Sequence, residues 1–160
     1  MANTGWSGDF SYRYYRRILQ ALEGRFRPRL FRDSPGLSSL SGNVFLRHDI
    51  DISLPPALRM ASVEREQGMA ATYMVMMRSS LYDVSGADSR RILQEILGMG
   101  HEVGVHFDCP EGLRREQGQV EALESSILED CRRLEDILGT AVRSVSFHRP
   151  ITWLLRGPLR

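Results

Sequence analysis

The stretch from Arg47 to Asp51 (RHDID) concentrates chemically active side chains directly behind the apolar run 44–46 (VFL). An apolar strand that ends in charged residues delivers them to an open edge of a sheet or barrel. Because side chains alternate along a strand, Asp49 and Asp51 share one face and His48 points to the other. Two neighbouring carboxylates repel each other unless a positive group lies between them, and a divalent metal commonly fills that place. The alternative is a solvated turn in which both aspartates cap a following helix.

Two histidines extend this candidate site. In parallel α/β proteins the reactive residues lie at the carboxyl ends of strands, and His106 and His148 end two later apolar runs. Together with Asp51 they offer one carboxylate and two imidazoles. That donor set suits zinc, or another borderline divalent ion, with one coordination position open for water. Asp49 is then placed to take a proton from that water.

Other polar side chains near predicted strand ends divide into two groups. Arg78 and Asp108 are candidates for contacts with a substrate. His48 and His101 are predicted to point away from the site, and His101 lies five residues before His106, a spacing that reverses the face of a strand. We therefore interpret His101 as structural.

A regular alternation of strands and helices positions these residues. The amphipathic stretch 9–26 predicts a first helix, and the Ser-, Gly- and Pro-rich stretch 33–42 predicts a loop. Alternation then predicts right-handed βαβ units, and hence an α/β fold with a parallel sheet or barrel. The predicted strands are 43–49, 70–77, 101–106 and 142–148, and the predicted helices are 55–67, 87–98 and 115–138.

Four strands are few for a closed barrel, and residues 151–160 resemble the beginning of a further element. We therefore expect one domain over residues 1–160, with its barrel part over 43–160 and its last strands missing. A barrel opened in this way exposes a strand edge, so oligomers or aggregates are expected.

Composition restricts the class of protein. The 21 basic residues, all arginine, balance 20 acidic ones, and the near-neutral charge disfavours nucleic acid as a partner. The absence of lysine excludes any mechanism that needs one within these residues. Neither a membrane-spanning run nor a signal peptide is found. Cys109 and Cys131 lack the spacing of a metal finger, so a reduced, cytoplasmic chain is expected.

Three motifs in order, RHDID at 47–51, GHEVGVH at 100–106 and SFHRP at 146–150, resemble the polysaccharide deacetylase (NodB-homology, carbohydrate esterase) superfamily. More narrowly, they are similar to members found in bacterial surface-polysaccharide gene clusters. The resemblance runs from about residue 14 to the end of the chain. It implies an incomplete, distorted (β/α) barrel and a metal-dependent hydrolase of carbohydrate metabolism. Such an enzyme deacetylates an N-acetylated sugar or polysaccharide, and so cleaves a carbon–nitrogen bond that is not a peptide bond.

Carried over residue by residue, the resemblance implies that Asp49 is the catalytic base and Asp51 the metal-binding aspartate. It also implies that His106 is the first histidine of the family's HxxxH metal motif. Arg149 matches the arginine of the family's Arg-Pro motif, which orients the base. His148 is the substitute for the second metal-binding histidine.

The sequence departs from the family pattern at three places. Ile50 separates two aspartates that are adjacent in most members, and Pro110 stands where the second histidine of HxxxH is expected. The histidine that acts as general acid would lie beyond Arg160. A truncated, catalytically inactive domain that binds a metal or a sugar is therefore the main alternative. A phosphatase of the haloacid-dehalogenase type lacks its lysine here, and a D-x-D glycosyltransferase leaves both candidate histidines without a role.

Overall fold

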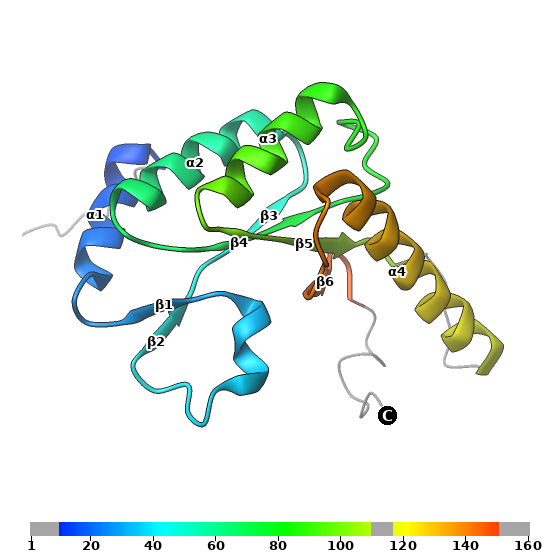
Figure 1. Ribbon diagram of the computed structural model, residues 1–160, viewed down its shortest axis with the longest axis horizontal. Coiled ribbons are helices and arrows are strands. Elements are labelled where there is room, and N and C mark those ends of the chain that lie inside the picture. The colour runs from blue at the N-terminus through cyan, green and yellow to red at the C-terminus, as the bar shows by residue number, and fades with distance from the viewer. Residues whose placement is uncertain (1–9, 110–116, 151–160) are drawn as a thin grey trace, which may run out of the picture.

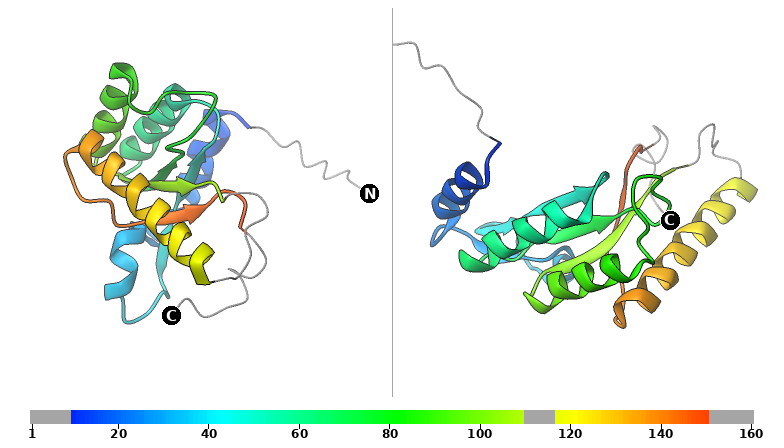
Figure 2. Two further views of the ribbon diagram at one scale, coloured as in Figure 1. Left: turned by 90° about the vertical axis from the view of Figure 1, so that its right-hand side faces the viewer. Right: turned by 90° about the horizontal axis from the view of Figure 1, so that it is seen from above.

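The computed structural model of the chain describes residues 10–109 and 117–150. Its centre is a four-stranded parallel sheet in the order β3-β4-β5-β6, which is also the order of these strands along the chain (Figure 1). Connections that always move to the next strand in the same direction place their helices on one face, as in a β/α barrel. Figure 2 shows the sheet curled like part of a barrel. The strands are β3 (Arg47–Ile50), β4 (Thr72–Val75), β5 (Glu102–Phe107) and β6 (Val145–Phe147).

The predicted helices are present, and their ends follow from local sequence. The helices are α1 (Tyr12–Leu22), α2 (Leu54–Glu66), α3 (Ala87–Gly98) and α4 (Gln117–Leu138). The first is shorter than the predicted 9–26, because the Ser11 hydroxyl accepts a hydrogen bond from the Tyr14 amide and so caps its start. Gly68 and Gly139 stop α2 and α4 with φ values of 65° and 69°. Among the described helices, none combines the length and the apolar character needed to cross a bilayer.

The predicted strand 43–49 is in fact two strands, which is a correction to the sequence analysis. β2 (Asn43–Phe45) pairs in parallel with β1 (Arg27–Arg29) in a separate two-stranded sheet, and β3 pairs with β4. β1 was not predicted, because two arginines and Pro28 hide its strand character. Part of the predicted loop is also ordered, as the 3-10 helix η1 (Phe31–Gly36). The outer ends of the predicted strands 70–77 and 142–148 lie outside β4 and β6.

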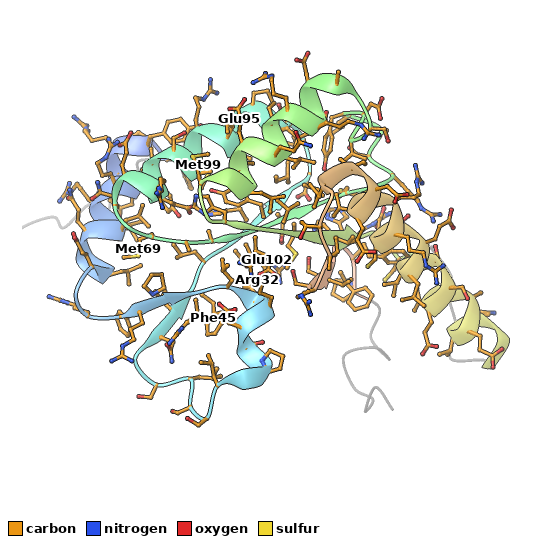
Figure 3. All side chains as sticks on the ribbon, viewed as in Figure 1. Arg32, Phe45, Met69, Glu95, Met99 and Glu102 are labelled. Carbon is orange, nitrogen blue, oxygen red and sulfur yellow. The ribbon has the colours of Figure 1, made fainter. Side chains whose placement is uncertain are left out.

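The segment that carries β1, η1 and β2 is attached to the beginnings of β4 and β5. The Phe31 and Arg32 amides donate to the Thr72 hydroxyl and the Glu102 carboxylate, each at 3.2 Å. Thr72 also donates to Glu102, at 2.7 Å. Figure 3 shows Arg32, Phe45 and Glu102 together beneath the sheet. These contacts lie at the amino ends of the strands, opposite the edge where the candidate site is expected.

The core lies between the sheet and the helices on its outer face. Every residue of β4 and β5 is buried, as expected for central strands of a parallel sheet that is covered on both faces. Tyr73, Val75 and Val105 belong to the core cluster with residues of α2, α3 and α4. Alternation therefore turns Met74 and His106 to the inner face of the curled sheet.

Candidate metal centre

Asp51, His106 and His148 converge at the carboxyl ends of β3, β5 and β6, as the sequence predicts. Asp51 Oδ1 lies 3.5 Å from His106 Nε2 and 3.4 Å from His148 Nδ1, and the two ring nitrogens are 3.2 Å apart. In a tetrahedral site with metal–ligand bonds of about 2.1 Å, ligand atoms are about 3.4 Å apart. The three side chains could therefore hold one metal ion without rearrangement of the backbone.

The hydrogen bonding of this cluster independently fits the binding of a cation. Asp51 Oδ1 is buried and accepts no hydrogen bond from the described residues. An orphaned buried carboxylate oxygen that faces two imidazoles is costly unless a cation binds to it. His106 Nδ1 lies 2.7 Å from the Ser146 hydroxyl, a bond that fixes the ring and turns Nε2 toward Asp51. Ser146 therefore orients a candidate metal ligand, a role that its position two residues before His148 did not suggest.

The electrostatics of His106 favour the form that binds metals. Burial is the largest influence and lowers the pKa of His106, although the nearby charges of Asp49 and Asp51 partly oppose it. A lowered pKa keeps the imidazole neutral near pH 7. Only a neutral imidazole has a free lone pair for a metal.

Asp49 lies beside the cluster and is held by Arg47. The guanidinium of Arg47 donates from Nε to Asp49 Oδ1 at 2.8 Å and from Nη2 to Oδ2 at 2.6 Å. Asp49 Oδ2 is 3.9 Å from His106 Nε2. Burial raises the pKa of Asp49, but the hydrogen bonds from Arg47 and the nearby positive charges outweigh it, so the pKa lies below its usual value. Asp49 is therefore an ionised carboxylate next to the metal ligands.

Arg149 and Asp108 form a pair of their own. Arg149 Nε and Nη2 donate to the two oxygens of Asp108, each at 2.9 Å. This pairing lowers the pKa of Asp108 through the hydrogen bonds from Arg149. In the structure, the guanidinium that donates hydrogen bonds to Asp49 is that of Arg47. That Arg149 orients the catalytic base therefore stays a prediction. The predicted contact of Asp108 with the substrate likewise stays a prediction.

Arg78 is directed to α4. Its Nε donates to Asp130 at 3.2 Å and its Nη2 to the Ser126 hydroxyl at 3.0 Å. Within residues 10–109 and 117–150, no ion pair or hydrogen bond joins Arg78 to the three-residue cluster. The role of Arg78 in substrate binding therefore stays a prediction. A cavity of about 520 Å³ instead opens beside Asp49 and Asp51, lined by residues of β3 and the start of α2.

His48 and His101 point away from the metal cluster, as strand alternation predicts. His48 Nε2 lies 2.5 Å from the buried carboxylate of Glu64. His101 Nδ1 accepts from the Ala71 amide at 3.1 Å, and its Nε2 lies 3.0 Å from the Ala61 carbonyl. Both histidines are thus parts of the scaffold.

Glu64 is the centre of a buried polar network that the sequence analysis missed. Tyr15 and Tyr73 donate to its two oxygens, the latter at 2.6 Å. A glutamate in the last turn of a helix usually faces solvent, and nothing in the spacing of Glu64 distinguished it from an exposed residue. The network connects α1, α2, β3 and β4, and it lies on the helix side of the sheet.

No model of a known protein family matches the chain, and a search of curated proteins finds no significant match. The resemblance to deacetylases therefore rests on the motifs. Position 110, where that family has its second metal-binding histidine, lies outside the described residues. The candidate metal centre rests on the geometry of the three side chains.

Proposed function

We propose that this protein is a zinc-dependent hydrolase of the polysaccharide deacetylase (NodB-homology) type, which removes the acetyl group from an N-acetylated sugar. The observation that carries the proposal is the convergence of Asp51, His106 and His148 at the spacing of one tetrahedral ion. The site lies at the carboxyl edge of a curled parallel sheet, which is where β/α barrels carry their active sites.

The donor set favours zinc. Two imidazoles and one carboxylate are typical of catalytic zinc sites with three protein ligands and one open position. A divalent ion held there would supply Lewis acidity, which polarises an acyl carbonyl and makes water nucleophilic near neutral pH.

The other groups of the site have roles that suit amide hydrolysis. Asp49 is ionised and close to the ligands, so it can accept the proton that water loses when it attacks the acetyl carbon. Arg47 orients that carboxylate through two hydrogen bonds. The cavity beside Asp49 and Asp51 offers space for a sugar ring. Asp108 and Arg149 supply further polar groups for the hydroxyls of a carbohydrate.

The second candidate is a domain that binds metal or sugar without turnover. The two hydrogen bonds from Arg47 occupy both oxygens of Asp49 and lower its pKa, which makes this carboxylate a weaker base. Such a protein would keep the metal affinity of the cluster and release no acetate.

Metal analysis combined with a turnover assay separates the two candidates. The purified protein is stripped with a chelator, titrated with Zn²⁺, and assayed for acetate release from N-acetylglucosamine oligomers. We expect one zinc per chain in the wild type and none in D51A or H106A. D49N should bind zinc and release no acetate, and D88N, a change at an exposed aspartate on α3, should behave as the wild type. Stoichiometric zinc without acetate release from the wild type would favour the non-catalytic candidate, and no zinc would exclude the zinc-dependent hydrolase.

A further inference from the structure

A second concave surface, different in character from the metal centre, lies on the segment that carries β1 and β2. It is a cavity of about 670 Å³, which we call the arginine pocket. Three arginines from one stretch of chain line it, together with serines of the η1–β2 loop and the asparagine that begins β2. These residues are Arg25, Arg27, Arg29, Ser39, Ser41 and Asn43.

The positive charge of the arginine pocket is not neutralised by the described part of the chain. No acidic residue lines the pocket, and none of the three arginines has an ion pair with a described carboxylate. Arg29 Nε donates to the neutral amide of Asn43 at 3.1 Å. In contrast, Arg47, Arg78 and Arg149 each face a carboxylate. Three uncompensated guanidinium groups around a hollow favour the binding of an anion.

The geometry of the pocket suits an extended ligand. Arg27 and Arg29 are two residues apart on β1 and so share a face, and Arg25 lies in the turn before that strand. Asn43 Nδ2 donates to the Ser39 and Ser41 carbonyls at 3.2 and 3.3 Å, which fixes the serine loop next to Asn43. The positive charge is therefore spread along the chain from this turn into β1 rather than held at a single point.

The uncharged lining suggests what carries the anion. Serine hydroxyls hydrogen-bond to hydroxyl groups, and the ring of Phe26 at the pocket is 42% exposed, an apolar surface on which a sugar ring can stack. Guanidinium forks match the oxygens of carboxylates, sulfates and phosphates. We propose that the arginine pocket binds an anionic saccharide, whose charged groups pair with Arg25, Arg27 and Arg29.

The pocket and the metal centre are distinct sites on consecutive strands, β2 and β3. The saccharide part of this inference rests on the proposed function, whereas the anion part rests on the pocket alone. If both hold, the substrate class narrows to acidic polysaccharides. Binding in the arginine pocket should not depend on the metal.

Binding experiments with the full chain test the inference directly. The probes are an oligogalacturonate, a sulfated oligosaccharide, a neutral N-acetylglucosamine oligomer and a single-stranded DNA oligonucleotide, measured by titration calorimetry. We expect the two charged saccharides to bind at least about tenfold more tightly than the neutral one, because each guanidinium forms charge-assisted hydrogen bonds. Added salt should weaken that binding through screening.

The decisive variant is R25S/R27S, which removes two exposed side chains and leaves the Arg29–Asn43 bond in place. Its matched control is R132S/R143S, which removes the same charge from exposed positions outside the pocket. The first variant should lose about tenfold in affinity for charged saccharides. The control, H106A and the chelated wild type should not. Thermal unfolding of each variant confirms that the fold is retained.

Each other outcome is decisive. The inference would be overturned if both double variants bound charged saccharides with equal affinity. It would also be overturned if the wild type bound charged and neutral saccharides equally well. Binding of DNA without binding of charged saccharides would assign the pocket to nucleic acid. Arginine-dependent saccharide binding without acetate release would uphold the inference while the proposed function fails. Acetate release without arginine-dependent saccharide binding would uphold the proposed function and overturn the inference.

Discussion

Arg47 and Asp49 form a two-point ion pair on a single face of β3, with Nε–Oδ1 and Nη2–Oδ2 distances of 2.8 and 2.6 Å. Strand alternation places both side chains on the face that also carries Asp51. The strand therefore presents, in order, a cation, a candidate base and a metal ligand. This arrangement keeps Asp49 ionised and holds it in one orientation beside His106.

Replacement of Arg47 by glutamine should shift the acidic limb of the pH–activity profile to higher pH. Burial raises the pKa of Asp49 and Arg47 lowers it, so loss of the guanidinium lets the pKa rise. Asp49 must be deprotonated to act as a base. As the pH falls, kcat/KM of the variant should therefore begin to decrease at a higher pH than kcat/KM of the wild type. Carboxyl NMR titration of the metal-free protein gives the same pKa without turnover. R59Q is the control, because the guanidinium of Arg59 lies over the ring of Tyr12. An unchanged Asp49 titration in R47Q would contradict the role of Arg47.

Loss of the Ser146 hydroxyl should weaken metal binding. This hydroxyl lies 2.7 Å from His106 Nδ1 and fixes the orientation of the ligand ring. Removal of such a supporting partner typically costs about 10- to 100-fold in metal affinity. We expect S146A to lose zinc affinity in this range when titrated against a competing chelator. S144A, a change on the same segment, should retain wild-type affinity. Equal affinities for the two variants would show that Ser146 does not support the ligand.

The candidate metal ligands could be predicted from the sequence because their placement follows from local rules. Each of Asp51, His106 and His148 follows or ends an apolar strand, and parallel strands bring their carboxyl ends to one edge. The opposite orientation of His101 also followed, since side chains alternate along a strand whatever the tertiary structure.

The missed features depend on contacts between segments that are distant in sequence. Glu64 is buried only because Tyr15, His48 and Tyr73 surround it, and its own helix shows no sign of this. Likewise β1 exists because it pairs with β2, which its composition does not favour. The pairing of Arg47 with Asp49 was open to prediction, because spacing of two residues on a strand already puts a cation next to the candidate base.

His101 and His106 should respond to substitution in opposite ways. H106A should lose zinc binding, because it removes a ligand atom. H101A should bind zinc and lose stability by about 2–4 kcal/mol, because it leaves a cavity and removes the partners of the Ala71 amide and the Ala61 carbonyl. Calorimetric zinc titration and urea unfolding measure the two effects. Loss of zinc from a folded H101A protein would refute the distinction.

Gly104 should be intolerant of any side chain. A Cβ atom at this position would lie 2.7 Å from the Ser144 carbonyl and 2.8 Å from Met74 Sδ. G104A should therefore push β6 away from β5 and cost about 1–3 kcal/mol, with a loss of zinc affinity as His148 shifts. G98A is the matched control: a Cβ atom built at this exposed last residue of α3 meets nothing within 4 Å, so stability should change by no more than about 0.5 kcal/mol. Comparable stabilities of the two variants would show that the close approach at Gly104 is unimportant.

Glu64 should make a large, pH-dependent contribution to stability. Burial raises its pKa, but hydrogen bonds and charge from His48 and hydrogen bonds from Tyr15 and Tyr73 outweigh it, so the pKa is lowered. A carboxyl group with a lowered pKa in the folded state stabilises the fold above its unfolded pKa, and this contribution is lost as the pH falls through the folded value. E64Q should cost about 3 kcal/mol near pH 7, because it breaks a buried charged network.

The loss in E64Q should shrink on acidification, because protonation removes the same contribution from the wild type. E66Q is the control, two residues away on α2, where the side chain is 58% exposed and pairs with Arg16. It should change stability by no more than about 1 kcal/mol at any pH. Urea unfolding from pH 7 to pH 3 measures both variants. A pH-independent difference between E64Q and the wild type would mean that the Glu64 charge does not stabilise the fold.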